Sequence, residues 1–109
     1  MISVTITLAD SNVHRLDLLM IAALAAESPA RSCPAYEFRE LNLLADNSNG
    51  AGTIYVGNSD VTNAIFAYTL QGGQSRYYPP KSLGAQLYYT STMYILGSAG
   101  LILHVEGSN

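Results

Sequence analysis

Residues 45–60 have the sequence ADNSNGAGTIYVGNSD, in which glycine, asparagine and aspartate flank one short apolar run. A phosphate-binding loop would end in Gly-Lys-Ser/Thr or open a helix, whereas Gly50 and Gly52 precede the β-type run 53–56. A calcium loop needs more carboxylates than Asp46 and Asp60 supply. Asparagine, aspartate and glycine also favour turns. We favour this last interpretation, which predicts two turns around a strand.

The chain beyond this segment continues in the same way. Its apolar runs are short and rich in Tyr, Ile, Val, Thr and Leu, and Gly, Asn and Pro separate them. Such spacing is typical of an antiparallel sandwich or barrel. The runs are TIYVG (53–57), AIFAYTL (64–70), QLYYT (86–90), TMYILGS (92–98) and LILHVEG (101–107).

The N-terminal part predicts a strand and then a helix. Residues 2–8 (ISVTITL) alternate apolar and polar side chains, the period of a half-buried strand. Residues from about 12 to 27 contain many good helix formers, with possible caps at 10–12 and a stop at Pro29. Because apolar residues surround this helix, we expect it to be covered on more than one side. Residues 35–46 fit a helix or a strand equally well.

The last apolar runs predict a hairpin. Leu101, Leu103 and Val105 share one face of the final strand, which should be core. Gly97 and Gly100 flank a Ser-Ala pair where the chain must reverse, which suits a short hairpin turn.

Composition limits the possible partners. The chain has 109 residues, which predicts one domain spanning 1–109. Charged residues make up 12% and the net charge is -3, which argues against nucleic acid as a partner. The apolar run 18–26 is too short to span a membrane, and no signal-peptide pattern is expected at the N-terminus.

The sequence offers little for catalysis or metal binding. His14, His104 and the single cysteine, Cys33, are far apart and do not have the spacing of zinc ligands. A G-x-S-x-G nucleophile elbow does not occur either. We therefore expect a non-enzymatic protein without a metal or other cofactor, in which Cys33 is a simple thiol.

The tyrosines are the best candidates for a contact surface. Tyrosine combines a large ring with a hydroxyl and is enriched in protein interfaces. The same residues could simply be half-buried strand residues, or could stack on sugars. The candidate protein-contact residues are Tyr77, Tyr78, Tyr88, Tyr89 and Tyr94.

Three segments taken together carry a resemblance to a known family: 38–63, 67–80 and 91–107. In order, they hold a strand ending in Ala-Asp, an IYVG strand followed by Asn-Ser-Asp, an L-x-x-G turn, and MYILGSAG leading to a final VE. This order resembles the small jelly-roll decoration, or cement, proteins on the outside of tailed-bacteriophage capsids.

The resemblance implies that residues 38–46 form a strand and that the chain is a homo-oligomer, a dimer or a trimer. It also implies a place in the virion, assembled in the host cytoplasm, with the major capsid (coat) protein as partner. It brings no catalytic residues. A neck, tail or fibre component and a carbohydrate-binding adhesin module remain alternatives. The expected fold is mainly β: an antiparallel, jelly-roll-like β-sandwich over about 35–107 with one N-terminal α-helix.

Overall fold

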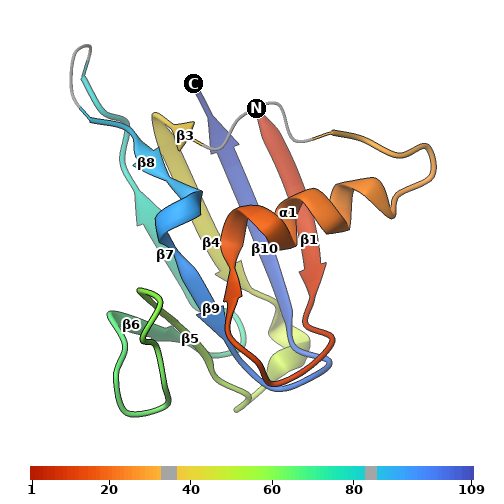
Figure 1. The fold of residues 1–109 in the computed structure, drawn as a ribbon, viewed down its shortest axis with the longest axis vertical. Coiled ribbons are helices and arrows are strands. Elements are labelled where there is room, and N and C mark those ends of the chain that lie inside the picture. Colours follow the sequence, from red (N-terminus) through yellow and green to blue (C-terminus); the bar gives the residue numbers. More distant parts are fainter. Residues whose placement is uncertain (33–36, 83–85) are drawn as a thin grey trace.

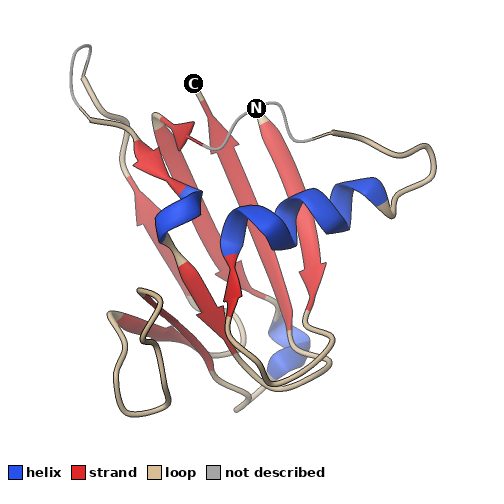
Figure 2. Cartoon of the chain, viewed as in Figure 1, coloured by secondary structure: helices blue, strands red, loops and turns tan. Residues whose placement is uncertain are grey.

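The computed structural model describes residues 1–32, 37–82 and 86–109. Cys33 and its expected role lie outside these residues. Over the described residues the fold is mainly β, as the sequence predicts, with one α-helix and two short 3-10 turns (Figures 1 and 2). In chain order the elements are β1 (Ile2–Thr7), β2 (His14–Arg15), α1 (Leu16–Ala25), β3 (Glu37–Phe38), β4 (Glu40–Ala45), η1 (Asn47–Asn49), β5 (Ile54–Gly57), β6 (Tyr68–Leu70), β7 (Ser75–Tyr78), β8 (Tyr88–Tyr89), η2 (Thr90–Thr92), β9 (Tyr94–Leu96) and β10 (Ile102–Ser108).

The strands form two four-stranded sheets and one small pair. The first sheet has the order β1-β10-β4-β7, and the second has the order β2-β9-β5-β6. Strands β3 and β8 form the small pair. All pairings are antiparallel. The long strand β10 lies between β1 and β4, so segments from both ends of the chain meet in one sheet (Figure 1).

One hydrophobic core joins both sheets and the helix. In β1, side chains alternate between buried and exposed, as the pattern of residues 2–8 predicts. The first sheet contributes Val4, Leu43 and Val105 among others, and the second contributes Ile54 and Ile95. The outer face of the first sheet is not covered by the helix, which lies on the opposite side in Figure 1. This arrangement, apolar on one face and polar on the other, is common for antiparallel sheets.

Helix α1 is shorter than the sequence predicts. The helix begins at Leu16 rather than near residue 12, because His14 and Arg15 form strand β2 and pair with β9. The expected caps at 10–12 are therefore wrong: the residue before the first helical one is Arg15, and no side chain caps the helix. Asp10 instead binds the backbone of Asn12 and the ring of His14. The helix ends at Ala25, ahead of Pro29.

Three strand predictions need correction. Only Tyr68–Leu70 of the run 64–70 is a strand, and the residues before it form a loop. Residues 75–78, which lie outside the predicted apolar runs, form edge strand β7 beside β4. Residues 97–101 do reverse the chain, with Gly100 at φ 93°, but they do not close a hairpin. They cross from β9 in one sheet to β10 in the other.

The ambiguous segment 35–46 is a strand over most of its described length, because Leu41, Leu43 and Ala45 face the core with a period of two. The two turns predicted around residues 53–56 are confirmed. In the first turn the Asp46 carboxylate accepts a hydrogen bond from the Ser48 amide, and Gly50 has φ 57°. In the second, the Asn58 side chain accepts from the Asp60 amide.

Candidate protein-contact site

Three tyrosines meet where the edge strands of the two sheets approach each other. The hydroxyls of Tyr68 (β6) and Tyr78 (β7) lie 2.7 Å apart. The rings of Tyr78 and Tyr88 (β8) are 5.0 Å apart in an edge-to-face arrangement, a geometry that stabilises aromatic pairs. The Tyr88 hydroxyl donates to the carbonyl of Pro79 at 2.8 Å. These three side chains, which we call the tyrosine cluster, close one side of the core.

Two cations cover the tyrosine cluster. The guanidinium carbon of Arg76 lies 5.1 Å from the centre of the Tyr68 ring and 5.9 Å from that of Tyr78. The Lys81 ammonium lies 4.7 Å from the Tyr88 ring centre. Such cation–π contacts are favourable at this range. Burial, and then the Tyr78 hydroxyl, raise the pKa of Tyr68 well above its ordinary value. Tyr68 is therefore a neutral phenol that is partly withdrawn from solvent.

Tyr77 points the opposite way from its neighbour Tyr78, as successive residues of a strand do. Its side chain is 53% exposed on the outer face of the first sheet, where its hydroxyl donates to the Glu40 carboxylate. The Ser108 hydroxyl donates to the other oxygen of Glu40 at 3.2 Å. The bond to Glu40 and, to a smaller extent, burial raise the pKa of Tyr77.

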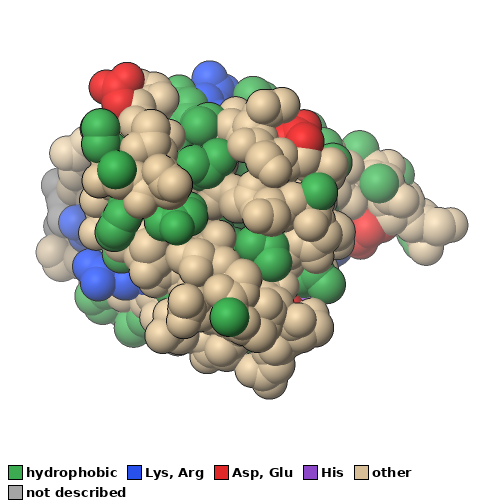
Figure 3. All heavy atoms as spheres, turned by 90° about the horizontal axis from the view of Figure 1, so that it is seen from below, with side chains coloured by type: hydrophobic (Ala, Val, Ile, Leu, Met, Phe, Trp, Pro, Cys, Tyr) green, Lys and Arg blue, Asp and Glu red, His purple; other side chains and the backbone are tan. Residues whose placement is uncertain are grey.

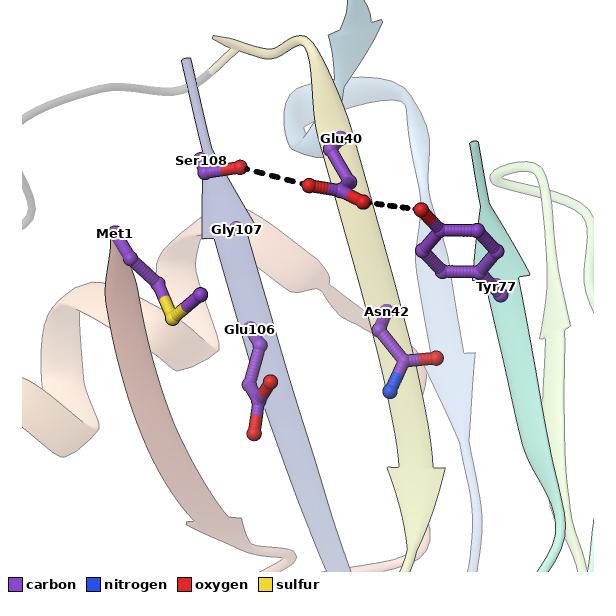
Figure 4. A pocket seen from close by; sticks show the side chains of 7 residues that line it. All are labelled: Met1, Glu40, Asn42, Tyr77, Glu106, Gly107 and Ser108. Carbon is purple, nitrogen blue, oxygen red and sulfur yellow. Dashed lines mark hydrogen bonds between the residues drawn. The ribbon is translucent and has the colours of Figure 1, made fainter. Parts of the chain in front are cut away.

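A shallow hollow of about 260 Å³ lies beside this contact (Figure 4). Strands β10, β4 and β7 carry most of its lining, and the Met1 side chain lies over one side. Its lining includes Glu40, Asn42 and Glu106. In chemical terms the hollow offers a ring edge, an amide and two carboxyl groups to a small polar ligand.

The five predicted contact tyrosines therefore do not form one surface. Tyr78 and Tyr88 contact each other inside the tyrosine cluster, whereas Tyr77 lies on the outer face. Tyr89 and Tyr94 are both half-buried. Tyr89 is paired with Glu37 across β8 and β3, and Tyr94 with Arg15 across β9 and β2. Adjacent tyrosines in a strand must point to opposite faces, so the sequence could have indicated that Tyr77 and Tyr78 separate.

The loop between β5 and β6 presents an apolar pair that the sequence interpretation had assigned to a strand. Ile65 is 58% exposed and Phe66 is 45% exposed. We call these two residues the apolar tip. The Phe66 ring packs against Tyr55 with their centres 5.4 Å apart. The signal in the sequence was two large apolar neighbours shortly after Thr62 and Asn63, residues well suited to a turn.

Hydrogen bonds within the loop hold the apolar tip in place. The Thr62 amide donates to the carbonyl of Ile65 at 2.8 Å, and the Thr62 hydroxyl accepts from the Ile65 amide at 2.9 Å. Val61 is buried and anchors the loop on the core side. The loop between β1 and β2 lies at the same end of the molecule (Figure 1), and in Figure 3 hydrophobic side chains outnumber charged ones across this end.

The remaining polar groups hold the fold together. His104 Nε2 lies 2.7 Å from an Asp46 carboxylate oxygen, and its Nδ1 lies 3.0 Å from the Thr5 hydroxyl. The bond to His104, followed by those to Ser48, lowers the pKa of Asp46. Within residues 1–32, 37–82 and 86–109, no three His, Cys, Asp or Glu side chains are grouped to hold a metal ion. In those same ranges no helix is long and apolar enough to cross a membrane.

Comparisons with protein families, with characterised proteins and with solved structures give no match to this chain.

Proposed function

We propose that this chain is a non-enzymatic structural protein of a phage virion, which binds the outside of the capsid and stabilises it through repeated contacts with the coat protein. The observation that carries the proposal is the apolar tip. Ile65 and Phe66 are more than two-fifths exposed, yet hydrogen bonds within the loop fix them. A preordered apolar pair loses little conformational entropy when a partner covers it.

The scarcity of charge supports the same function. Only 12% of the residues are charged, so binding would depend mainly on apolar and neutral polar contacts. Burial of apolar surface contributes about 25 cal/mol per Å², so two side chains give a modest contact. Repetition of that contact over a shell multiplies its effect. The jelly-roll-like sandwich belongs to this proposal, as does the resemblance of residues 38–107 to phage decoration proteins.

Co-sedimentation with coat protein tests the proposal. The purified chain should sediment with assembled shells, saturating at a fixed copy number, and should not bind coat protein that has not assembled. The double substitution Ile65→Ser with Phe66→Ser should abolish sedimentation with shells. Leu18→Ser is the matched control, because Leu18 is 53% exposed on α1, away from the tip.

Salt dependence separates this mechanism from one based on ion pairs. Apolar contacts are not screened by salt, so binding should change little between low and moderate ionic strength. A collapse of binding over that range would contradict the mechanism. Failure to bind either form of coat protein would instead favour a neck, tail or fibre component.

A second function is favoured by the hollow beside Tyr77. An exposed ring next to carboxyl and amide groups is the usual composition of a sugar-binding site, in which the ring stacks on the sugar and the polar groups bind its hydroxyls. A glycan array with the wild-type chain and a Tyr77→Ala variant tests this adhesin function. Binding that disappears in the variant would support it, and an array without hits would exclude it.

A further inference from the structure

The four edge strands of the two large sheets differ in their protection. Proteins commonly shield sheet edges with short strands, prolines or charged residues, since an exposed edge can pair with another strand. Edge strands β2 and β6 are two and three residues long. Strand β7 contains Arg76 and is followed directly by Pro79 and Pro80. Strand β1 has six residues, ISVTIT, with neither charge nor proline.

The backbone amides and carbonyls on the free edge of β1 are those of its odd-numbered residues. The Leu8 amide donates to Leu101, and the Leu8 carbonyl accepts from Gly100, so even-numbered residues point their backbone groups toward β10. Backbone groups alternate along a strand, and those of Ser3, Thr5 and Thr7 therefore point outward. The Arg31 guanidinium caps the carbonyl of Ser3 at 2.9 Å. Among residues 1–32, 37–82 and 86–109, no backbone group bonds the outward amides and carbonyls of Thr5 and Thr7, which leaves them open to a partner strand.

A groove runs along this free edge. It has a volume of about 400 Å³ and lies between β1 and helix α1, which crosses β1 in Figure 1. One wall is formed by Thr5, Ile6 and Thr7, and Ala9 and His14 complete the lining at one end. The other wall is formed by Leu19, Ala22 and Ala23 of the helix and by Ala26, which directly follows it. Alanine side chains allow another backbone to approach the helix closely.

We propose that a second copy of this chain occupies the edge, and that two β1 strands pair antiparallel about a two-fold axis at Ile6. In this register Thr5 faces the partner's Thr7, and Thr7 faces the partner's Thr5. Each of these residues then donates and accepts one backbone hydrogen bond across the axis, while Arg31 keeps its bond to Ser3. The four-stranded sheets of the two copies become one continuous sheet.

The composition of the edge selects a second copy as the occupant. A two-fold interface brings the same surface together from both sides, so any charge near the axis would face itself. Residues 2–8 carry no charge, and Thr–Thr pairs across strands are favourable. The alanine faces of the two α1 helices would meet over the same axis. The dimer does not depend on the proposed attachment to capsids, because the apolar tip lies in the loop between β5 and β6 and not on strand β1.

Sedimentation equilibrium over a range of concentrations tests the dimer. The wild-type chain should show twice its 11.7 kDa mass. Thr5→Lys combined with Thr7→Lys places lysines opposite lysines, which should weaken the dimer by about tenfold or more. Both side chains are exposed in the single chain, but Thr5→Lys also removes the bond of the Thr5 hydroxyl to His104, so circular dichroism of each variant must show that the fold is kept.

A variant with the opposite charges separates loss of the dimer from loss of the fold. The variant with Thr5→Glu and Thr7→Glu should also be monomeric, but an equimolar mixture with the lysine variant should form a heterodimer. Ser75→Lys, on the same face at the opposite edge, should leave the dimer intact. A wild-type monomer or trimer, or a dimer unaffected by the paired lysines, would overturn the proposal. Ile65→Ser with Phe66→Ser should remove capsid binding without changing the mass, so the two proposals can fail separately.

Discussion

The hydroxyls of Tyr68 and Tyr78 lie 2.7 Å apart and join the edge strand of one sheet to the edge strand of the other. These two edge strands, β6 and β7, are not paired with each other through backbone hydrogen bonds. Residues 71–74 link the two strands along the chain. The tyrosine side chains add a second connection, in which the Arg76 guanidinium covers both rings.

Removal of both hydroxyls should cost less than the sum of the two single removals. Tyr68→Phe or Tyr78→Phe leaves a partly buried hydroxyl without its partner, and each should lower the free energy of unfolding by about 1–2 kcal/mol. The double variant should lose less than the sum, by about 0.5–1.5 kcal/mol, because no orphaned hydroxyl remains. Urea unfolding of the four proteins measures this coupling. Strict additivity would show that the two hydroxyls do not interact.

Asp46 should make stability dependent on acid pH. Its pKa is lowered by the His104 ring and by Ser48, so the folded state prefers the ionised carboxylate. Its stabilising contribution is complete above the unfolded pKa of about 3.8 and is lost as the pH falls below that value. Unfolding of wild type and Asp46→Asn between pH 2 and 7 checks this. The difference in unfolding free energy should be largest at neutral pH and shrink in acid; a constant difference would contradict it.

Gly107 should tolerate no larger residue. A β-carbon at this position of β10 would lie 2.5 Å from the Phe38 ring, which is buried. Gly107→Ala should therefore destabilise the chain by about 1–3 kcal/mol through overpacking. The second substitution Phe38→Leu should recover part of that loss by making room. Thermal unfolding of both variants, beside Phe38→Leu alone, tests the contact. If Gly107→Ala alone were neutral, the close packing described here would be wrong.

Asp17 should be important for the start of the helix. It is 2% exposed, and both of its oxygens accept hydrogen bonds from the Arg15 guanidinium at 2.8 Å. Asp17 also accepts a hydrogen bond from the Leu18 amide. The first turn of the helix has no capping side chain, so this carboxylate gives one of its amides an acceptor. Asp17→Ala leaves these donors unsatisfied and should cost about 1–3 kcal/mol. Glu27→Ala, which breaks an exposed ion pair with Arg31, is the control and should cost under about 1 kcal/mol.

Residues with a strict period of two were predictable from the sequence, and residues that depend on distant partners were not. The alternation of residues 2–8 alone predicts β1, and that of residues 101–107 predicts most of β10. Residues 14–15 lie within the helix predicted over about 12–27, but pairing with β9 draws them into a strand. Ser75 and Arg76 look like a connection, and only the neighbouring strand β4 makes them part of a sheet.

The directions in which the five candidate tyrosines point were harder to predict, for a related reason, and their contact role stays a prediction. The five tyrosines were chosen by residue type, and type does not determine direction. Tyr78 and Tyr88 turn toward Tyr68, which was not singled out because its partners lie on other strands. Ile65 and Phe66 have strong β propensity, and only the hydrogen bonds of the loop place them outside the sheet.

The position of β10 between β1 and β4 has a consequence for how the chain reaches its fold. Thr5 and His104 are 99 positions apart, so β1 must wait for nearly the whole chain before it meets its only neighbour in the sheet. Pairings this distant close large loops and slow folding. During synthesis on the ribosome, neither β1 nor β4 can pair with β10, the strand that lies between them, until residues 102–108 have emerged. We therefore expect the first sheet to be completed in a late step that brings β1 and β4 onto the two sides of β10.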